Sequence, residues 1–270
     1  MANGEGRLPS TRKEQIGYIL KYYFGNVSFM SYMTFLFAVP FLIFLFFFAY
    51  QWTALLNNEE ATKASLMLFG GVYGLGIAPL TGVIGVGLSG SYTMMMRMTS
   101  DQPCNTKNYW IGIKENGLKF FLYYAILGFL AYIVIFNFFF FYQENIGFLY
   151  VFMKFFSLVI FAFMLLVITC ASAEQVKYQM KIKDILKNAF ILSFKRPIST
   201  LIIVLLTILP IFSLLFFSRV VKVVILAILF LFYFGLATLV IVEWYQYIFD
   251  EVIHKEHQPD EYHRGLSRGE

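Results

Sequence analysis

The chain has 270 residues, of which 59 % are hydrophobic, 20 % aromatic and only 14 % charged. Soluble domains of this size carry about 25 % charged residues, so this composition excludes a water-soluble globular fold. Two cysteines cannot form a disulfide framework or a four-cysteine zinc site, and the net charge of +5 has to be located before nucleic acid is considered as a partner.

Six long apolar segments follow one another along the chain. They lie at 32–52, 66–96, 118–142, 146–170, 198–217 and 220–245. Each has about 20 or more residues almost without charge, which is enough for a helix to cross a hydrocarbon core of about 30 Å. Runs such as FLIFLFFFAY do not alternate as barrel strands would. We therefore predict an all-α, polytopic integral membrane protein with six transmembrane helices, forming a single domain over residues 1–270.

Three stretches combine a polar face with an apolar one. QIGYILKYYF predicts an interfacial amphipathic helix at 14–24, and KIKDILKNAF predicts another at 182–194. A third, NYWIGIKENGLKFF, predicts one at 108–121, although Gly112 and Gly117 interrupt it. The chain thus resembles three repeats of an amphipathic helix followed by two spans. Such helices either anchor the protein to the membrane surface or dock to a partner there.

The second span contains GGVYGLGIAPLTGVIGVGLSGSY, which is rich in residues that weaken helices. Gly74, Ala78 and Gly82 recur at intervals of four, and Gly85 follows after three, so small residues line one face. Such faces allow helices to approach closely in lipid. Pro79 removes a backbone donor and predicts a kink or a break. We expect a central helix that packs through this face; the alternative is unwound backbone that lines a solute pathway.

Few ionisable residues fall within the predicted spans. Lys154 lies about two turns from the outer end and can extend its ammonium to the interface. Glu243 lies near the inner end of the last span, where we expect water or a headgroup to reach it. Since paired intramembrane charges are typical of ion or proton pathways, their absence from the sequence pattern favours packing over transport for the second span.

Lysine and arginine are distributed unevenly about the predicted spans. Seventeen of the 21 fall in the N-terminal arm (1–31), the two long loops and the tail (250–270), and four fall on the other side of the six-span bundle (32–249). Because cytoplasmic loops accumulate these residues, both termini are predicted to be cytoplasmic. The same asymmetry accounts for the basic surplus, so no nucleic-acid partner is expected.

The sequence contains none of the common catalytic signatures for nucleotide binding, zinc proteolysis or serine hydrolysis. His254, His257 and His263 cluster in HKEHQPDEYH, where metal binding is conceivable. A solvated and poorly ordered tail is the favoured interpretation. We therefore expect no enzymatic activity, no cofactor and no metal site.

The order of motifs from Pro79 onward resembles the YesL-like family of bacterial membrane proteins. The likeness lies in APLTGVIGVGLSGSYTMMMRM, YWIGIKENGLKF and LKNAFILSFKRPISTL, which fall within residues 75–205, while the first span and the tail lie outside it. The resemblance implies a protein of the bacterial cytoplasmic membrane, whose relatives often accompany carbohydrate ABC importers. An E-A-A coupling loop typical of the permease itself is not found in the sequence.

We therefore expect a non-enzymatic membrane subunit, an accessory or regulatory component of a bacterial carbohydrate ABC uptake system. Its expected partners are membrane lipids and the ABC transporter permease and ATPase subunits. The residues expected to pack helices are Gly74, Ala78, Pro79, Gly82 and Gly85, and those expected to contact a cytoplasmic partner are Trp110, Lys114, Asn116, Lys187 and Asn188. The alternative is a standalone small-solute transporter or channel that uses the broken second span.

Overall fold

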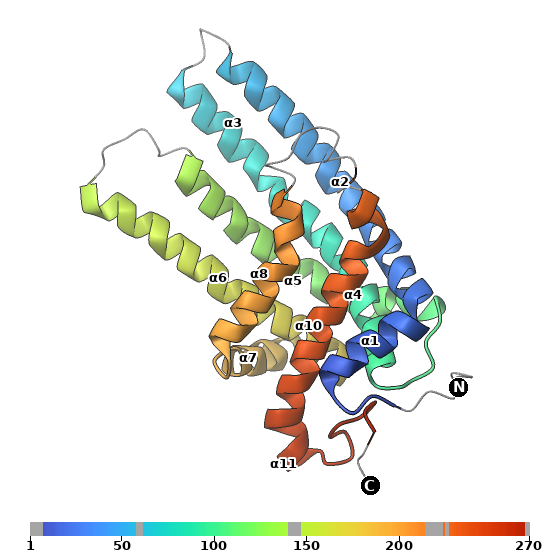
Figure 1. Cartoon of the computed structure of the whole chain (residues 1–270). Coiled ribbons are helices and arrows are strands. Elements are labelled where there is room, and N and C mark those ends of the chain that lie inside the picture. Colours follow the sequence, from blue (N-terminus) through green and yellow to red (C-terminus); the bar gives the residue numbers. More distant parts are fainter. Residues whose placement is uncertain (1–7, 58–61, 140–146, 214–223, 225–226, 268–270) are drawn as a thin grey trace.

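The structure is a computed structural model that describes residues 8–57, 62–139, 147–213, 224 and 227–267 (Figure 1). These residues form helices and no β-strand. The helices are α1 (Arg12–Tyr22), α2 (Phe24–Leu56), α3 (Lys63–Leu75), α4 (Ile77–Thr99), α5 (Lys107–Phe139), α6 (Gly147–Tyr178), α7 (Ile182–Ser193), α8 (Pro197–Ser213), the π-helical turn η1 (Leu229–Tyr233), α10 (Phe234–Phe249), the π-helical turn η2 (Asp250–His254) and α11 (Lys255–His257). The predicted all-helical class is confirmed.

Within the described ranges, five helices are long and apolar enough to cross a membrane. They are Phe24–Leu55, Met67–Thr99, Lys107–Phe138, Val151–Tyr178 and Phe230–His257. A sixth crossing is counted only if α7 and α8, which are bent by 105° at the break between them, form one broken span. The fifth predicted span (198–217) corresponds to α8 and then continues beyond the described residues.

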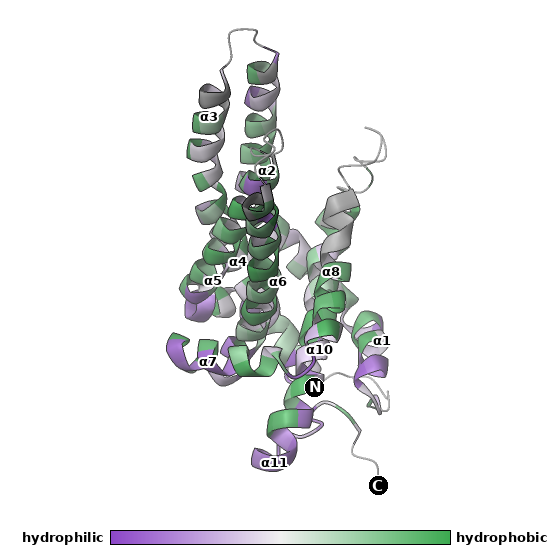
Figure 2. Cartoon of the chain, turned by 90° about the vertical axis from the view of Figure 1, so that its left-hand side faces the viewer, coloured by the Kyte–Doolittle hydropathy of each residue, from purple (hydrophilic) through white to green (hydrophobic). Residues whose placement is uncertain are grey.

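Two of the three predicted amphipathic helices are present as separate elements. Helix α1 begins at an N-cap, where the Thr11 side chain accepts a hydrogen bond from the Glu14 amide, and it buries Ile19. Helix α7 buries Ile185 and Ala189 and exposes Lys187 on the opposite side. Figure 2 shows the hydrophilic colouring of this helix at one end of the bundle.

The predicted separate helix at 108–121 is wrong, because α5 runs without a break from Lys107 to Phe139. Neither glycine interrupts it. An added Cβ on Gly112 would lie 2.9 Å from the carbonyl oxygen of Ser89, so this glycine allows α5 to approach α4 closely. The expected threefold repeat is therefore not kept in the middle of the chain.

The C-terminal segment packs against the bundle at His254 and Leu266, which corrects in part the expectation of a solvated tail; residues 255–260 are exposed as expected. The last described helix continues to His257, well past the predicted span end at 245. Leu266 is buried, and the Ser267 amide donates a hydrogen bond to the Pro9 carbonyl oxygen (2.8 Å). The two described chain ends therefore lie side by side at the same end of the bundle (Figure 1). We call this end, which also holds α1, α7 and α11, the terminal end.

The largest buried side chains gather in the half of the bundle nearer the terminal end. They include Tyr92, Tyr109, Tyr123, Tyr245, Phe120 and Phe249. At the opposite end, large apolar side chains are exposed: Phe46 and Leu68 are both 70 % exposed, and Phe148 is 85 % exposed. Exposed apolar surface of this extent suits contact with lipid. The packed half is the one that can position a polar site.

Candidate functional site

The small-residue face of α4 is packed against α5. An added Cβ on Gly85 would lie 2.6 Å from the Phe120 carbonyl oxygen, and one on Gly82 would lie 2.9 Å from that of Phe121. On α3, Gly74 faces the ring of Tyr132. Rings and carbonyl groups of α5 thus occupy the space beside the glycines, and we call this contact the α4–α5 seam.

The break in the second span lies at Gly76, between α3 and α4, rather than at Pro79 itself. Proline lacks the N–H that would bond to the Leu75 carbonyl four residues earlier, so the helix restarts just before it. The side chain of Pro79 is exposed, and Ala78 is half-buried, so these two residues do not lie at the centre of the bundle. The Thr81 hydroxyl bonds to the Ile77 carbonyl oxygen of its own helix (3.0 Å).

The residues expected to meet a partner fall on two different helices. Trp110, which is 52 % exposed, and Lys114 lie on the first turns of α5, whereas Lys187 is exposed on α7. Asn116, which is also expected to contact a partner, is buried against α6, and Asn188 is half-buried. Helix α6 lies between the two groups, since it contacts both α5 and α7.

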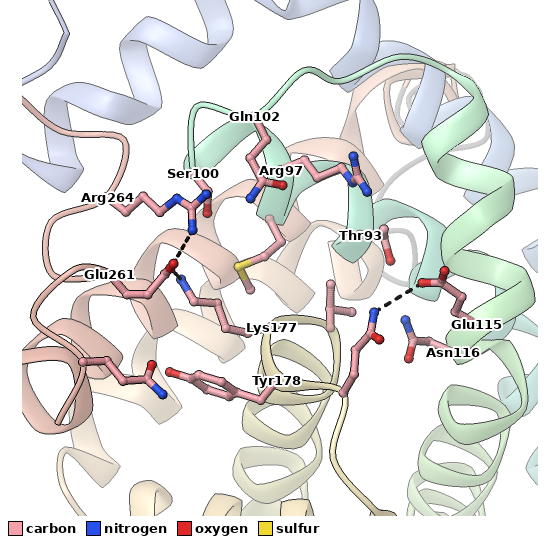
Figure 3. A pocket seen from close by; sticks show the side chains of 14 residues that line it. Thr93, Arg97, Ser100, Gln102, Glu115, Asn116, Lys177, Tyr178, Glu261 and Arg264 are labelled. Atoms are coloured by element: carbon pink, nitrogen blue, oxygen red, sulfur yellow. Dashed lines mark hydrogen bonds and ion pairs between the residues drawn. The ribbon is translucent and has the colours of Figure 1, made fainter.

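A polar cavity of about 420 Å³ opens at the terminal end among α4, α5, α6 and the C-terminal segment (Figure 3). Its lining residues are Thr93, Met96, Arg97, Ser100, Gln102, Glu115, Asn116, Val176, Lys177, Tyr178, Gln179, Gln258, Glu261 and Arg264. Of these residues, the sequence pattern predicts a functional role only for Asn116, because the cavity is formed by residues from four distant segments. We call it the polar cavity.

One wall of the polar cavity is an ion-pair cluster. Lys177 Nζ lies 3.2 Å from Glu261 Oε2, and Arg264 also pairs with the Glu261 carboxylate. The Lys177 side chain is only 8 % exposed, and its ammonium also donates to Gln246 Oε1 (3.4 Å). The cluster attaches the C-terminal segment to α6, as Figure 3 shows.

Protonation of Glu261 is expected to loosen this wall. Burial raises the pKa of Glu261, but the Lys177 ammonium and the Arg264 guanidinium outweigh burial and lower it below 4.5. A carboxyl group whose pKa is lower in the folded than in the unfolded state stabilises the fold when the pH is above its unfolded-state pKa. This stabilisation is lost as the pH falls through its folded-state pKa. We expect limited proteolysis of the C-terminal segment to increase below about pH 4.5. Glu261→Gln should be cleaved readily already at pH 7; equal resistance of this variant and the wild type at pH 7 would contradict the assignment.

The opposite wall carries amide groups. Gln179 Nε2 donates to Glu115 Oε2 (3.3 Å), and Gln175 Nε2 donates to Asn116 Oδ1 (3.4 Å). The amide nitrogen of Asn116 is buried and has no hydrogen-bond partner in the described structure. Arg97 lines the same cavity without an ion pair to any described residue.

A second polar network lies between α1, α6 and η2. Nε and Nη2 of Arg12 donate to Asp250 Oδ2 at 3.1 and 2.7 Å, and both side chains are at least 90 % buried. His254 Nδ1 donates to Asp250 Oδ1 (2.7 Å), and Nε2 of the same ring lies 2.8 Å from the Tyr178 hydroxyl oxygen. Both ring nitrogens of this histidine are therefore engaged. Among the described residues, no group of three or more His, Cys, Asp or Glu is placed to hold a metal ion.

Two buried carboxylates differ from what the sequence predicts. Glu243 is only 3 % exposed, so the expectation that water or a headgroup reaches it is wrong; it lines a smaller cavity of about 330 Å³. Glu174, which no sequence pattern indicates as a functional residue, is 1 % exposed on α6. Asn188 lies beside Glu174, yet neither the Glu174 nor the Glu243 carboxylate makes a hydrogen bond of normal geometry to any residue in the described ranges. The small residues Ala171, Ser172 and Ala173 come directly before Glu174. They are the local sign that the helix predicted at 146–170 continues past residue 170.

Comparison of the chain with models of protein families, with curated proteins and with solved structures found no match. The resemblance to the YesL-like family therefore depends on the sequence motifs quoted above.

Proposed function

We propose that this protein is a non-enzymatic subunit of the bacterial cytoplasmic membrane, with its terminal end in the cytoplasm, and that it assembles there with a carbohydrate ABC transporter. The observation that carries the proposal is the closed α4–α5 seam. Phe120 and Phe121 occupy the space beside Gly85 and Gly82, so the glycines of the second span serve helix contact. This supports a packing role over a solute pathway along that span.

The surface around the start of α5 supports a docking role. Trp110 is half-exposed beside the cation Lys114 one turn later, both at the terminal end. Tryptophan is enriched among the residues that anchor protein interfaces, and Lys114 places a positive charge beside it. The choice of an ABC transporter as the partner comes from the family resemblance.

Affinity purification from the native membrane in a mild detergent tests this proposal. We expect the wild-type protein to recover permease and ATPase subunits, and we expect Trp110→Ala with Lys114→Glu to reduce their recovery by about tenfold, as loss of an interface anchor does. The matched control is Tyr22→Ala with Lys21→Glu, an exposed aromatic and lysine on α1 at the same end. Recovery of no transporter subunit by the wild type would contradict the proposal.

The polar cavity favours a second candidate function, a standalone small-solute transporter or channel. The two candidates differ in what the purified protein does alone. Under our proposal, proteoliposomes that contain only this chain take up labelled sugar or ions no faster than protein-free liposomes. Uptake that is abolished by Arg97→Gln, in the cavity lining, would instead establish the transporter.

A further inference from the structure

One buried hydrogen-bond donor of the polar cavity has no partner among the described residues. The carboxylate of Glu261 is paired with Lys177 and Arg264, and that of Glu115 accepts from Gln179. The amide nitrogen of Asn116 finds no acceptor in the part of the chain that the structure describes, although its residue is only 2 % exposed. A buried donor without a partner destabilises the folded state. A ligand with hydrogen-bond acceptors would therefore bind favourably in this cavity.

The charge of the lining points the same way. Arg97 makes no ion pair within the described ranges, and Lys177 and Arg264 share the single carboxylate of Glu261. Glu115 is exposed, so solvent screens its charge. Three cations and two carboxylates line the cavity, so the lining carries an excess of one positive charge, which an anionic group would neutralise. A guanidinium offers two parallel N–H donors that match the oxygens of a phosphate.

The size and polarity of the cavity restrict the ligand further. A volume of about 420 Å³ is within the range of small-molecule sites. Met96 and Val176 are apolar among its 14 lining residues, so the walls offer little surface for an acyl chain. Ser100, Gln102 and Gln258 supply hydroxyl and amide groups that can meet ligand hydroxyls.

We propose that the polar cavity binds a small, water-soluble phosphate ester of a polyhydroxyl compound. Its phosphate is held by the guanidinium of Arg97 on α4 and the amide nitrogen of Asn116 on α5, both of which belong to the cavity lining (Figure 3). The ammonium of Lys177, on α6, adds a further positive charge to the cavity lining. This goes beyond the proposed subunit role, because it gives the protein a ligand of its own.

Binding to the full-length protein in phosphatidylcholine nanodiscs tests the proposal. The probes are glucose 6-phosphate and glucose, with isothermal titration calorimetry as the readout. We expect glucose 6-phosphate to bind at least about tenfold more tightly than glucose, because charge-assisted hydrogen bonds form only with the phosphate. Arg97→Gln and, separately, Asn116→Asp should each weaken glucose 6-phosphate by about tenfold or more. The matched control is Arg196→Gln, which removes a cation paired with Glu251 outside the cavity.

Three outcomes would overturn the proposal. The first is equal affinity for the two probes, and the second is unchanged affinity in Arg97→Gln or Asn116→Asp variants that unfold at the wild-type temperature. The third uses nanodiscs that contain phosphatidylglycerol: an Arg97-dependent rise in unfolding temperature there, without binding of either soluble probe, would assign the phosphate to a lipid headgroup. None of these measurements requires the transporter partner. The ligand proposal can therefore be contradicted while the proposed subunit role stands, and the reverse.

Discussion

Asp250→Asn is expected to lower the free energy of unfolding by about 3–5 kcal/mol, because it leaves the guanidinium of Arg12 buried without its counter-charge. The exposed fractions of the two side chains are 10 % and 6 %, so water does not replace the lost partner. The substitution also weakens the acceptor for His254, which donates to the same carboxylate. Reversible unfolding in mixed micelles, followed by circular dichroism, measures the loss.

The adjacent residue supplies a matched control for this prediction. Glu251 pairs with Arg196 at 3.0 Å, but their side chains are 38 % and 39 % exposed. An exposed pair of this kind is worth about 0–1 kcal/mol, so Glu251→Gln should change stability little. Combining Asp250→Asn with Arg12→Met removes both charges of the buried pair and should recover part of the loss. Equal costs for Asp250→Asn and Glu251→Gln would contradict the role assigned to the buried pair.

Composition and periodicity were sufficient for the helical class and for α1 and α7, because each of these depends on short-range pattern. The bend between α7 and α8 is also explained by the local sequence. Proline is favoured at the first position of a helix, and α8 begins at Pro197, directly after residues 194–196. At 108–121, the two glycines suggested an interruption, but packing against α4 keeps α5 continuous. Tertiary contact outweighed local propensity there.

The polar cavity and the buried network could not be predicted from local pattern. Arg12 and Asp250 are separated by 238 positions, and no local rule pairs them. A weak signal was present in the spacing of Asp250 and His254, which lie four residues apart and so share one helical face. The charge of this stretch nevertheless favours a solvated tail, because a charged C-terminal stretch is usually exposed. Pairing with α1 and α6 makes burial of this stretch possible.

The glycines of the second span show the same division between local pattern and tertiary contact. Their spacing predicts a small-residue face, but only the structure shows which positions touch backbone. At Gly85, the nearest atom to an added Cβ is the carbonyl oxygen of Phe120, and backbone cannot move aside as a flexible side chain does. At Gly117, in the same seam, an added Cβ would meet Val86 at 3.5 Å, which is ordinary contact.

Gly85→Ala is therefore expected to destabilise the protein by about 1–3 kcal/mol, the cost of overpacking, whereas Gly117→Ala is expected to be neutral or to stabilise it by about 0.5–1 kcal/mol through helix propensity. The same micelle unfolding measurement compares the two. Both substitutions add one methyl group to a helix in the α4–α5 seam, so they change hydrophobicity and helix propensity alike. If the free energy of unfolding falls for one variant and rises for the other, the difference is due to the close approach of backbone at Gly85. If Gly85→Ala proved as stable as Gly117→Ala, the seam would be looser than the structure shows, and the argument that α5 closes the glycine-rich face against a solute pathway would lose its support.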